Sequence, residues 1–284
     1  MIKLNPKSSQ KLSYFILFLA TILAIAPVII IVFIIVKNGL SAITWEFLTS
    51  MPKNGIREGG ILPAILGTLS IVACAIIITL PIGVFAAIYL NEYARDDLFT
   101  RVIKLAIVNL AGIPSVVYGL FGLGIFVMFL RLGVSIIAGS LTLSIMELPV
   151  IITTARSALN NVPHSFREAS LSLGVSRWQT IKYVVLPNAI PGILTGAVLS
   201  IARISGETAP ILFTAVAFYV PRLPHSIFDQ VMALPYHLYI VSTQIPCMSR
   251  KVIFGTALVL LLLVLTVNFV AIVARVYFRR HRKW

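Results

Sequence analysis

Two opposite charges interrupt an apolar part of the chain, in the stretch RISGETAP at residues 203–210. Arg203 and Glu207 are four residues apart, so they share one face of a helix. A guanidinium presents a fork of donors that suits an oxyanion, and a neighbouring carboxylate can hold it in place. The pair therefore predicts a point on an anion pathway, with Thr208 beside it. The alternative is an ion pair that only fixes helix packing.

The composition places this pair in a membrane. The 284 residues are 59% hydrophobic and 11% charged, with a mean hydropathy of +1.00. These values exclude an ordinary soluble domain. The two Cys and four His show no disulfide or metal spacing. The formal net charge is +14. In a membrane protein, Lys and Arg gather in cytoplasmic loops, so this explanation has to be tested before a nucleic-acid partner is considered.

Six segments are long and apolar enough to span a bilayer: 14–36, 62–90, 105–130, 133–155, 190–219 and 252–276. The first also resembles a signal peptide with a cleavage site at Ala24-Ile25-Ala26. Its apolar run continues to Val36, however, which favours an uncleaved span. The predicted fold class is an all-α integral membrane protein with six transmembrane helices.

Lys and Arg are concentrated in the segments that lie inside if the N-terminus is cytoplasmic. This bias predicts that both termini are cytoplasmic and explains the basic charge without nucleic acid. The expected organisation is a cytoplasmic segment at 1–13, a first span with an external loop at 14–61, a transmembrane domain at 62–276 and a basic cytoplasmic tail at 277–284.

The longest inside loop contains PHSFREASLSLGVSRWQTIKYVVLP at residues 163–187. Capping boxes that begin at Ser165 and Ser176 predict two short helices, with a left-handed corner at Gly174 between them. Pro187 should end the second helix at or before Leu186. The first helix is too short to be stable alone. Its apolar strip (Phe166, Ala169 and Leu173) should dock in a groove of a partner protein, lie on the lipid interface or fold against its own bundle.

The same residues resemble the "EAA" loop of ABC-importer permeases. The spacing of Glu168, Ala169, Gly174, Leu186 and Pro187 fits that pattern throughout, with Ser170 and Val184 as small departures. The resemblance implies a type I importer permease of MetI-like architecture. It also implies that residues 163–187 form a coupling loop that seats on a separate ATPase subunit.

Three further stretches resemble the PstA-type membrane subunit of bacterial phosphate importers: AGIPSVVYGLFGLG at 111–124, ARISGETAPILFTA at 202–215 and MALPYHLY at 232–239. The likeness covers about residue 59 to the C-terminus. It implies a multi-pass, non-enzymatic permease subunit in a bacterial cytoplasmic membrane that carries inorganic phosphate. The implied partners are a second related permease, two ATPase subunits that use ATP and Mg, and a periplasmic phosphate-binding protein. This chain itself would bind no cofactor and no metal.

The fifth predicted span extends the charged face of Arg203 with small residues. Gly192 and Gly196 fall within an arc of about 80° that also holds Arg203 and Glu207. Such a ridge lets another helix approach closely, and it is expected to face the partner permease across the pathway. Pro210 should loosen the outer end of this span. In the third span, Pro114 and Gly119 allow a bend, close packing or gating.

Some positions depart from the family pattern and keep alternatives open. Thr153 and Arg156 stand where a basic and then an acidic residue are expected, and Glu147 stands where an apolar one is expected. Arg203 is one candidate partner for Glu147. The alternatives are a permease for sulfate, molybdate or tungstate, a secondary transporter with proton sites at Glu147 and Glu207, and a scaffold for phosphate sensing.

Overall fold

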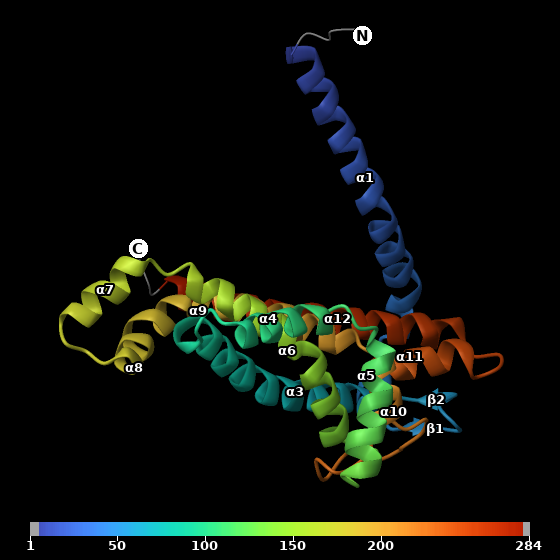
Figure 1. Cartoon of the computed structure of the whole chain (residues 1–284). Helices are drawn as coiled ribbons and strands as arrows, with labels where there is room; N and C mark the ends of the chain where they lie inside the picture. The colour runs from blue at the N-terminus through green and yellow to red at the C-terminus, as the bar shows by residue number, and fades with distance from the viewer. Residues whose placement is uncertain (1–5, 281–284) are drawn as a thin grey trace.

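The computed structural model describes residues 6–280, most of which are helical (Figure 1). The long helices are α1 (Pro6–Gly39), α3 (Leu62–Ile88), α6 (Ile136–Asn160), α9 (Leu186–Gly206) and α12 (Arg250–Arg280). The shorter helices are η1 (Leu40–Ala42), α2 (Trp45–Thr49), α4 (Leu98–Leu110), α5 (Ser115–Gly122), α7 (His164–Ser172), α8 (Arg177–Thr180), α10 (Ala209–Thr214) and α11 (Leu234–Thr243). Wider π-helical turns, η2 (Tyr89–Tyr93), η3 (Leu123–Phe129) and η4 (Ile181–Val185), continue α3, α5 and α8. The strands β1 (Pro52–Lys53) and β2 (Glu58–Gly59) pair antiparallel.

Five helical stretches of the described range are long and apolar enough to cross a membrane, and there are six if the bent pair of α4 and α5–η3 is one span. The predicted spans at 14–36, 62–90, 133–155 and 252–276 overlap four of these stretches. These are Gln10–Ala42, Leu62–Tyr93, Ile136–Asn160 and Arg250–Tyr277. The predicted all-α membrane fold is therefore confirmed.

The third and fifth spans differ from the prediction in their course. The segment predicted at 105–130 bends by 104° between α4 and α5, and Pro114 is the residue that precedes α5. The segment predicted at 190–219 instead begins at Arg177 and ends at Gly206, after which the chain turns into α10. Hydropathy averages composition along a window, so it registers neither break.

The packing of the bundle centres on α6. This helix packs along α3 and α9, and α12 packs along α9. The contact with α3 is close, because a Cβ on Gly83 would lie 2.5 Å from Ile151 Cγ2. Helix α1 contacts α12 near its C-terminal end and projects away from the bundle over the rest of its length (Figure 1). Its exposed apolar surface is that expected of a span in contact with lipid or with another subunit.

The two ends of the bundle carry different structures (Figure 1). One end carries α7 and α8, and the other carries α2, the β1–β2 hairpin and α11. At the second end, a turn at residues 225–229 covers the start of α6: the carbonyls of Ile227 and Asp229 accept the N–H groups of Ile137 and Ile136. The carboxylate of Asp229 closes this turn by accepting the N–H groups of His225 and Ser226 at 2.8 and 3.0 Å.

This turn is expected to loosen in acid. The two backbone N–H donors hold the pKa of Asp229 below its usual range, so the turn is stabilised at neutral pH. That stabilisation is lost as the pH falls from about 4 through the lowered pKa. Hydrogen-exchange protection of residues 225–229 and 136–137 should therefore fall in acid. Asp229→Ala should show the same loss at pH 6, and unchanged protection in that variant would contradict the assignment.

Candidate functional site

Arg203 lies at the centre of a charge cluster inside the bundle. It is in the last turn of α9, and its Nε is 3.3 Å from Glu147 Oε1 and 3.5 Å from Glu207 Oε1. Glu207 is not on the helix but directly follows it in an extended conformation (ψ 133°). The i, i+4 ion pair predicted from the sequence therefore forms across a break in the span. Glu147, from α6, is the second carboxylate on the same guanidinium.

Glu147 is the most deeply buried member of this cluster. Its side chain is 0% exposed, and neither carboxylate oxygen has a hydrogen-bond partner within residues 6–280. A charge at that depth is costly unless it is compensated, and Arg203 supplies the compensation. The Arg203 side chain remains 43% exposed. Both carboxylates thus contact the guanidinium at Nε, while part of the Arg203 side chain remains accessible.

The small residues of α9 face a different neighbour from the one predicted. A Cβ on Gly192 would lie 2.5 Å from Ala158 Cβ, and one on Gly196 would lie 2.1 Å from Thr154 Oγ1. Both contacts are with α6 of this chain, so the expectation that this ridge faces a partner permease is wrong. Periodicity identifies a face of a helix but does not identify the helix packed against it.

Two discontinuous helices meet beside Arg203. Helix α10 begins after the break at Glu207, with Thr208 as its N-cap and Pro210 in its first turn, and it packs on α5, which follows Pro114. A Cβ on Gly119 of α5 would lie 3.0 Å from both Ala209 O and Pro210 Cα. Breaks of this kind expose backbone groups at membrane depth and are typical of substrate sites in transporters.

The bend between α4 and α5 is bridged by a side chain. The hydroxyl of Tyr118 donates to the carbonyl of Leu110 at 2.8 Å, which satisfies an acceptor at the C-terminal end of α4. Tyr118 is itself buried in the apolar cluster that contains Leu143 and Ile204. This hydrogen bond and the packing of Tyr118 stabilise the bend.

Of the three positions that depart from the family pattern, Glu147 is part of the Arg203 cluster, while Thr153 and Arg156 lie further along α6. Thr153 donates back to the carbonyl of Pro149 at 2.7 Å within its own helix. Arg156 Nε is buried and has no hydrogen-bond partner in the described part of the chain. Neither residue is among the ion-pair partners of Arg203, which are Glu147 and Glu207.

The 163–187 loop forms two helices and a corner, with two corrections. Gly174 has the predicted left-handed conformation (φ +77°), and the capping box of Ser176 with Gln179 is confirmed. Ser165 is not an N-cap, because α7 begins at His164 and Pro163 precedes it without a side-chain cap.

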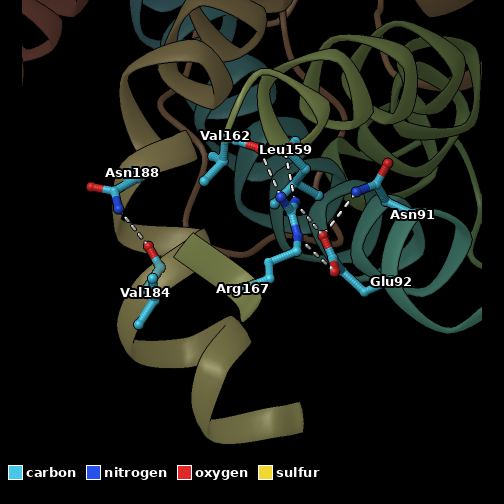
Figure 2. Close-up of polar contacts among 7 residues, drawn as sticks. All are labelled: Asn91, Glu92, Leu159, Val162, Arg167, Val184 and Asn188. Carbon is cyan, nitrogen blue, oxygen red and sulfur yellow. Dashed lines mark hydrogen bonds and ion pairs between the residues drawn. The ribbon is translucent and has the colours of Figure 1, made fainter. Parts of the chain in front are cut away.

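The predicted helix end at Pro187 is also wrong. Residues Arg177–Gly206 form one long helical stretch, in which Pro187 lies in the first turn of α9. The π-helical turn η4 comes directly before it, and the Asn188 side chain donates to the Val184 carbonyl at 2.7 Å (Figure 2). The wider turn before Pro187 accommodates its missing N–H, and the Asn188 side chain satisfies the carbonyl of Val184.

The outward surface of this loop is partly apolar. Glu168 and Ala169 are exposed, and Leu173 beside Gly174 is 82% exposed. Phe166, predicted on the same strip, instead packs into the cluster between α3, α6 and η4. Leu186 packs against that cluster as well. The exposed surface is therefore narrower than predicted and lies toward the corner.

Ser176→Ala is expected to loosen α8. Loss of an N-cap costs about 1 kcal/mol, so amide exchange over residues 176–181 should rise by about fivefold. Ser172→Ala is the matched control, because Ser172 is exposed and donates only back to the Glu168 carbonyl within α7. Equal exchange in both variants, measured on the purified complex, would show that the cap does not stabilise the loop.

Arg167 and Glu92 form a buried ion pair behind the loop (Figure 2). The sequence patterns singled out neither Arg167 nor Glu92. The available signal was a carboxylate at the end of an otherwise apolar span. The pair joins positions 75 residues apart, which no local pattern predicts.

Broken spans around a buried charge cluster, together with a helical loop at one end, define a multi-pass membrane transport protein. The model of the family described as "binding-protein-dependent transport system inner membrane component" matches residues 79–284. The chain therefore belongs to this family: it is a transport subunit of the inner membrane.

Named relatives and solved structures agree with this assignment. The chain is 35% identical to a probable ABC transporter permease protein, YqgI, of Bacillus subtilis, over 94% of this chain and 95% of that one. It is 33% identical to the phosphate transport system permease protein PstA 1 of Mycobacterium tuberculosis, over 98% and 90% of the two chains. A bacterial alginate ABC transporter, solved with a periplasmic protein bound to an alginate pentasaccharide, shares the fold. Its TM-score is 0.66, at 15% identity and 93% coverage of both chains.

Proposed function

We propose that this chain is the permease subunit of an ATP-driven importer that carries inorganic phosphate across the bacterial cytoplasmic membrane. The name of the PstA 1 relative, which spans nearly the same length, supports phosphate as the substrate. The observation that carries the proposal is Arg203, placed between Glu147 and Glu207 at the break between α9 and α10. A partly accessible guanidinium at a broken span is suited to a passing oxyanion.

The importer we propose has several partners. A second related permease completes the pathway, two ATPase subunits use ATP and Mg, and a periplasmic phosphate-binding protein delivers the anion. The chain itself binds no cofactor, and both of its termini are cytoplasmic. The 163–187 loop, with its exposed Glu168, Ala169 and Leu173, seats on an ATPase subunit, and alternating access moves the anion past Arg203.

Glu207 gives this site a basis for selectivity. Near neutral pH phosphate still carries protons while sulfate does not, so a carboxylate accepts a hydrogen bond from phosphate but only repels sulfate. Glu207 beside Arg203 thus favours a protonated oxyanion. Sulfate that passes the wild-type complex as readily as phosphate would contradict this role.

The test is uptake of labelled phosphate by proteoliposomes that hold the full complex, with ATP inside and the binding protein outside. ATP-dependent uptake supports the proposal. Uptake that persists without ATP and collapses with the proton gradient would instead indicate a secondary transporter. ATP-dependent uptake of sulfate, molybdate or tungstate but not of phosphate would support an importer and contradict phosphate as its substrate.

A further inference from the structure

Arg167 of α7 is held by four hydrogen bonds (Figure 2). Its Nη2 donates to Glu92 Oε1 at 2.8 Å and its Nε to Glu92 Oε2 at 3.3 Å. Its Nη1 donates to the Val162 carbonyl at 2.7 Å, and Nη2 also reaches the Leu159 carbonyl at 2.9 Å. The Arg167 and Glu92 side chains are only 12% and 8% exposed. Four of the five N–H donors of the guanidinium are thus engaged away from bulk water.

The partners of Arg167 belong to different elements. Glu92 lies in η2, which ends the α3 span, and Leu159 lies in the last turn of α6, whose carbonyls lack partners within the helix. Val162 lies in the short connection between α6 and α7. One side chain therefore ties α7 to the ends of two spans, and it places a positive charge at the negative end of the α6 dipole.

Two neighbouring contacts also hold the Glu92 carboxylate and helix α7 in place. Asn91 donates to Glu92 Oε1 at 2.8 Å and so orients the carboxylate. Ser170 and Thr180 hydroxyls, both buried, are 2.9 Å apart and join α7 to α8. The outward residues of α7 remain exposed, so these contacts occupy the inner face of the helix and leave the opposite face to a partner.

We propose that the Arg167–Glu92 pair is a positioning clamp that makes α7 and the adjoining ends of α3 and α6 move as one body. This inference rests on the proposed function, in which an ATPase subunit displaces α7. Without the pair, a nine-residue helix held by Phe166, by the Ser170–Thr180 contact and by its flanking chain would absorb part of such a displacement. With the clamp, a displacement of α7 also moves α6, which carries Glu147 of the charge cluster.

The chemistry requires arginine and a carboxylate at these positions. Lys has the charge but not the planar fork, so it cannot bond Glu92 bidentately and also reach two carbonyls. Gln at position 92 keeps the shape but loses the charge that compensates the buried guanidinium. Arg167→Lys and Glu92→Gln therefore weaken the clamp in two independent ways with little change in volume.

The first measurement is phosphate uptake per ATP hydrolysed, by the full complex in proteoliposomes. In both variants ATPase activity should stay within about twofold of wild type while uptake per ATP falls by tenfold or more. The matched control is the exposed ion pair of Arg101 and Asp96. Arg101 Nη2 lies 3.3 Å from Asp96 Oδ2, and the two side chains are 67% and 76% exposed. Arg101→Lys and Asp96→Asn should leave the ratio unchanged. An unchanged ratio in the clamp variants, or parallel losses explained by complex yield, would overturn the proposal.

The second measurement does not depend on the substrate. Spin labels at Arg95→Cys and His164→Cys, in a background with Cys74 and Cys247 replaced, report the distance between the end of the α3 span and α7. In the wild-type complex this distance should be the same with and without ATP, and in Arg167→Lys its distribution should broaden. A distance that shifts with ATP in the wild-type chain would exclude a clamp. If the distance stays constant but the complex does not carry phosphate, the clamp is supported and the proposed substrate is contradicted.

Discussion

Arg203→Gln is expected to lower ATP-driven phosphate uptake by about 100-fold while binding-protein delivery is unaffected. A guanidinium that meets an oxyanion with two charge-assisted hydrogen bonds contributes about 1.5–3 kcal/mol for each bond. Gln keeps a polar side chain, but it is shorter and loses the charge and the fork. Arg203→Lys should give an intermediate loss, because the charge remains without the planar geometry.

The same substitution also removes the partner of Glu147, so a folding defect has to be separated from a transport defect. Glu147 is fully buried, and an uncompensated buried charge is strongly destabilising. The double variant Arg203→Gln with Glu147→Gln removes both charges and should restore the yield of assembled complex. It should not restore uptake, because no cation remains on the pathway.

The single and the double variant distinguish a role of Arg203 in anion transport from a role in charge balance alone. If the double variant recovers both yield and uptake, Arg203 only balances Glu147 and the pathway lies elsewhere. If it recovers yield and stays inactive, with ATPase activity retained, Arg203 acts on the anion. The measurements are size-exclusion yield, ATPase rate and initial uptake rate on the same preparations.

Local patterns predicted the parts of this structure that depend on local chemistry. Four of the six spans follow from apolar length, and the corner at Gly174 and the cap at Ser176 follow from residue type and spacing. The pairing of Arg203 with Glu207 also follows from spacing, and it persists although Glu207 has left the helix. In each case the interacting groups are within a few residues of one another along the chain.

Features that depend on distant contacts were not accessible in the same way. Hydropathy cannot report the direction of the backbone, so it placed 105–130 and 190–219 as continuous spans. Only the residue types of Pro114 and Pro210 indicated a bend in the first and a loosened outer end in the second. The ridge of Gly192 and Gly196 was assigned to the wrong neighbour for a related reason. The spacing of the two glycines allows any helix of suitable shape to pack closely against them. In this structure that helix is α6 of the same chain.

The side chain of Pro187 shows how one rule can be overridden. Proline normally ends the preceding helix because it lacks an N–H and crowds the previous turn. Here the π-helical turn η4 widens the backbone just before it, and the helical stretch continues from Arg177 to Gly206. The 163–187 loop is thereby joined to the span that carries Arg203 without a flexible link.

The close approach of α5 to α10 leads to the second large effect. Gly119→Leu should reduce phosphate uptake by at least tenfold, because the new side chain must push Ala209 and Pro210 away. A Cβ there would already lie 2.9 Å from Phe213 Cδ2 and 3.0 Å from the backbone of α10. Overpacking of this kind costs about 1–3 kcal/mol. The displaced residues directly follow Glu207 and Thr208, so the strain reaches the charge cluster.

Gly124→Leu is the matched control in the same helical stretch. No atom lies within 4 Å of a Cβ built on Gly124, so this variant should transport within about twofold of wild type. Comparing the two separates local overpacking from a general intolerance of bulk in the α5–η3 stretch. If both variants transport normally, α5 and α10 can separate without consequence, and their contact does not position Arg203. If both fail equally, the contact at Gly119 is not the reason, and the face of η3 that carries Gly124 must itself pack against a partner.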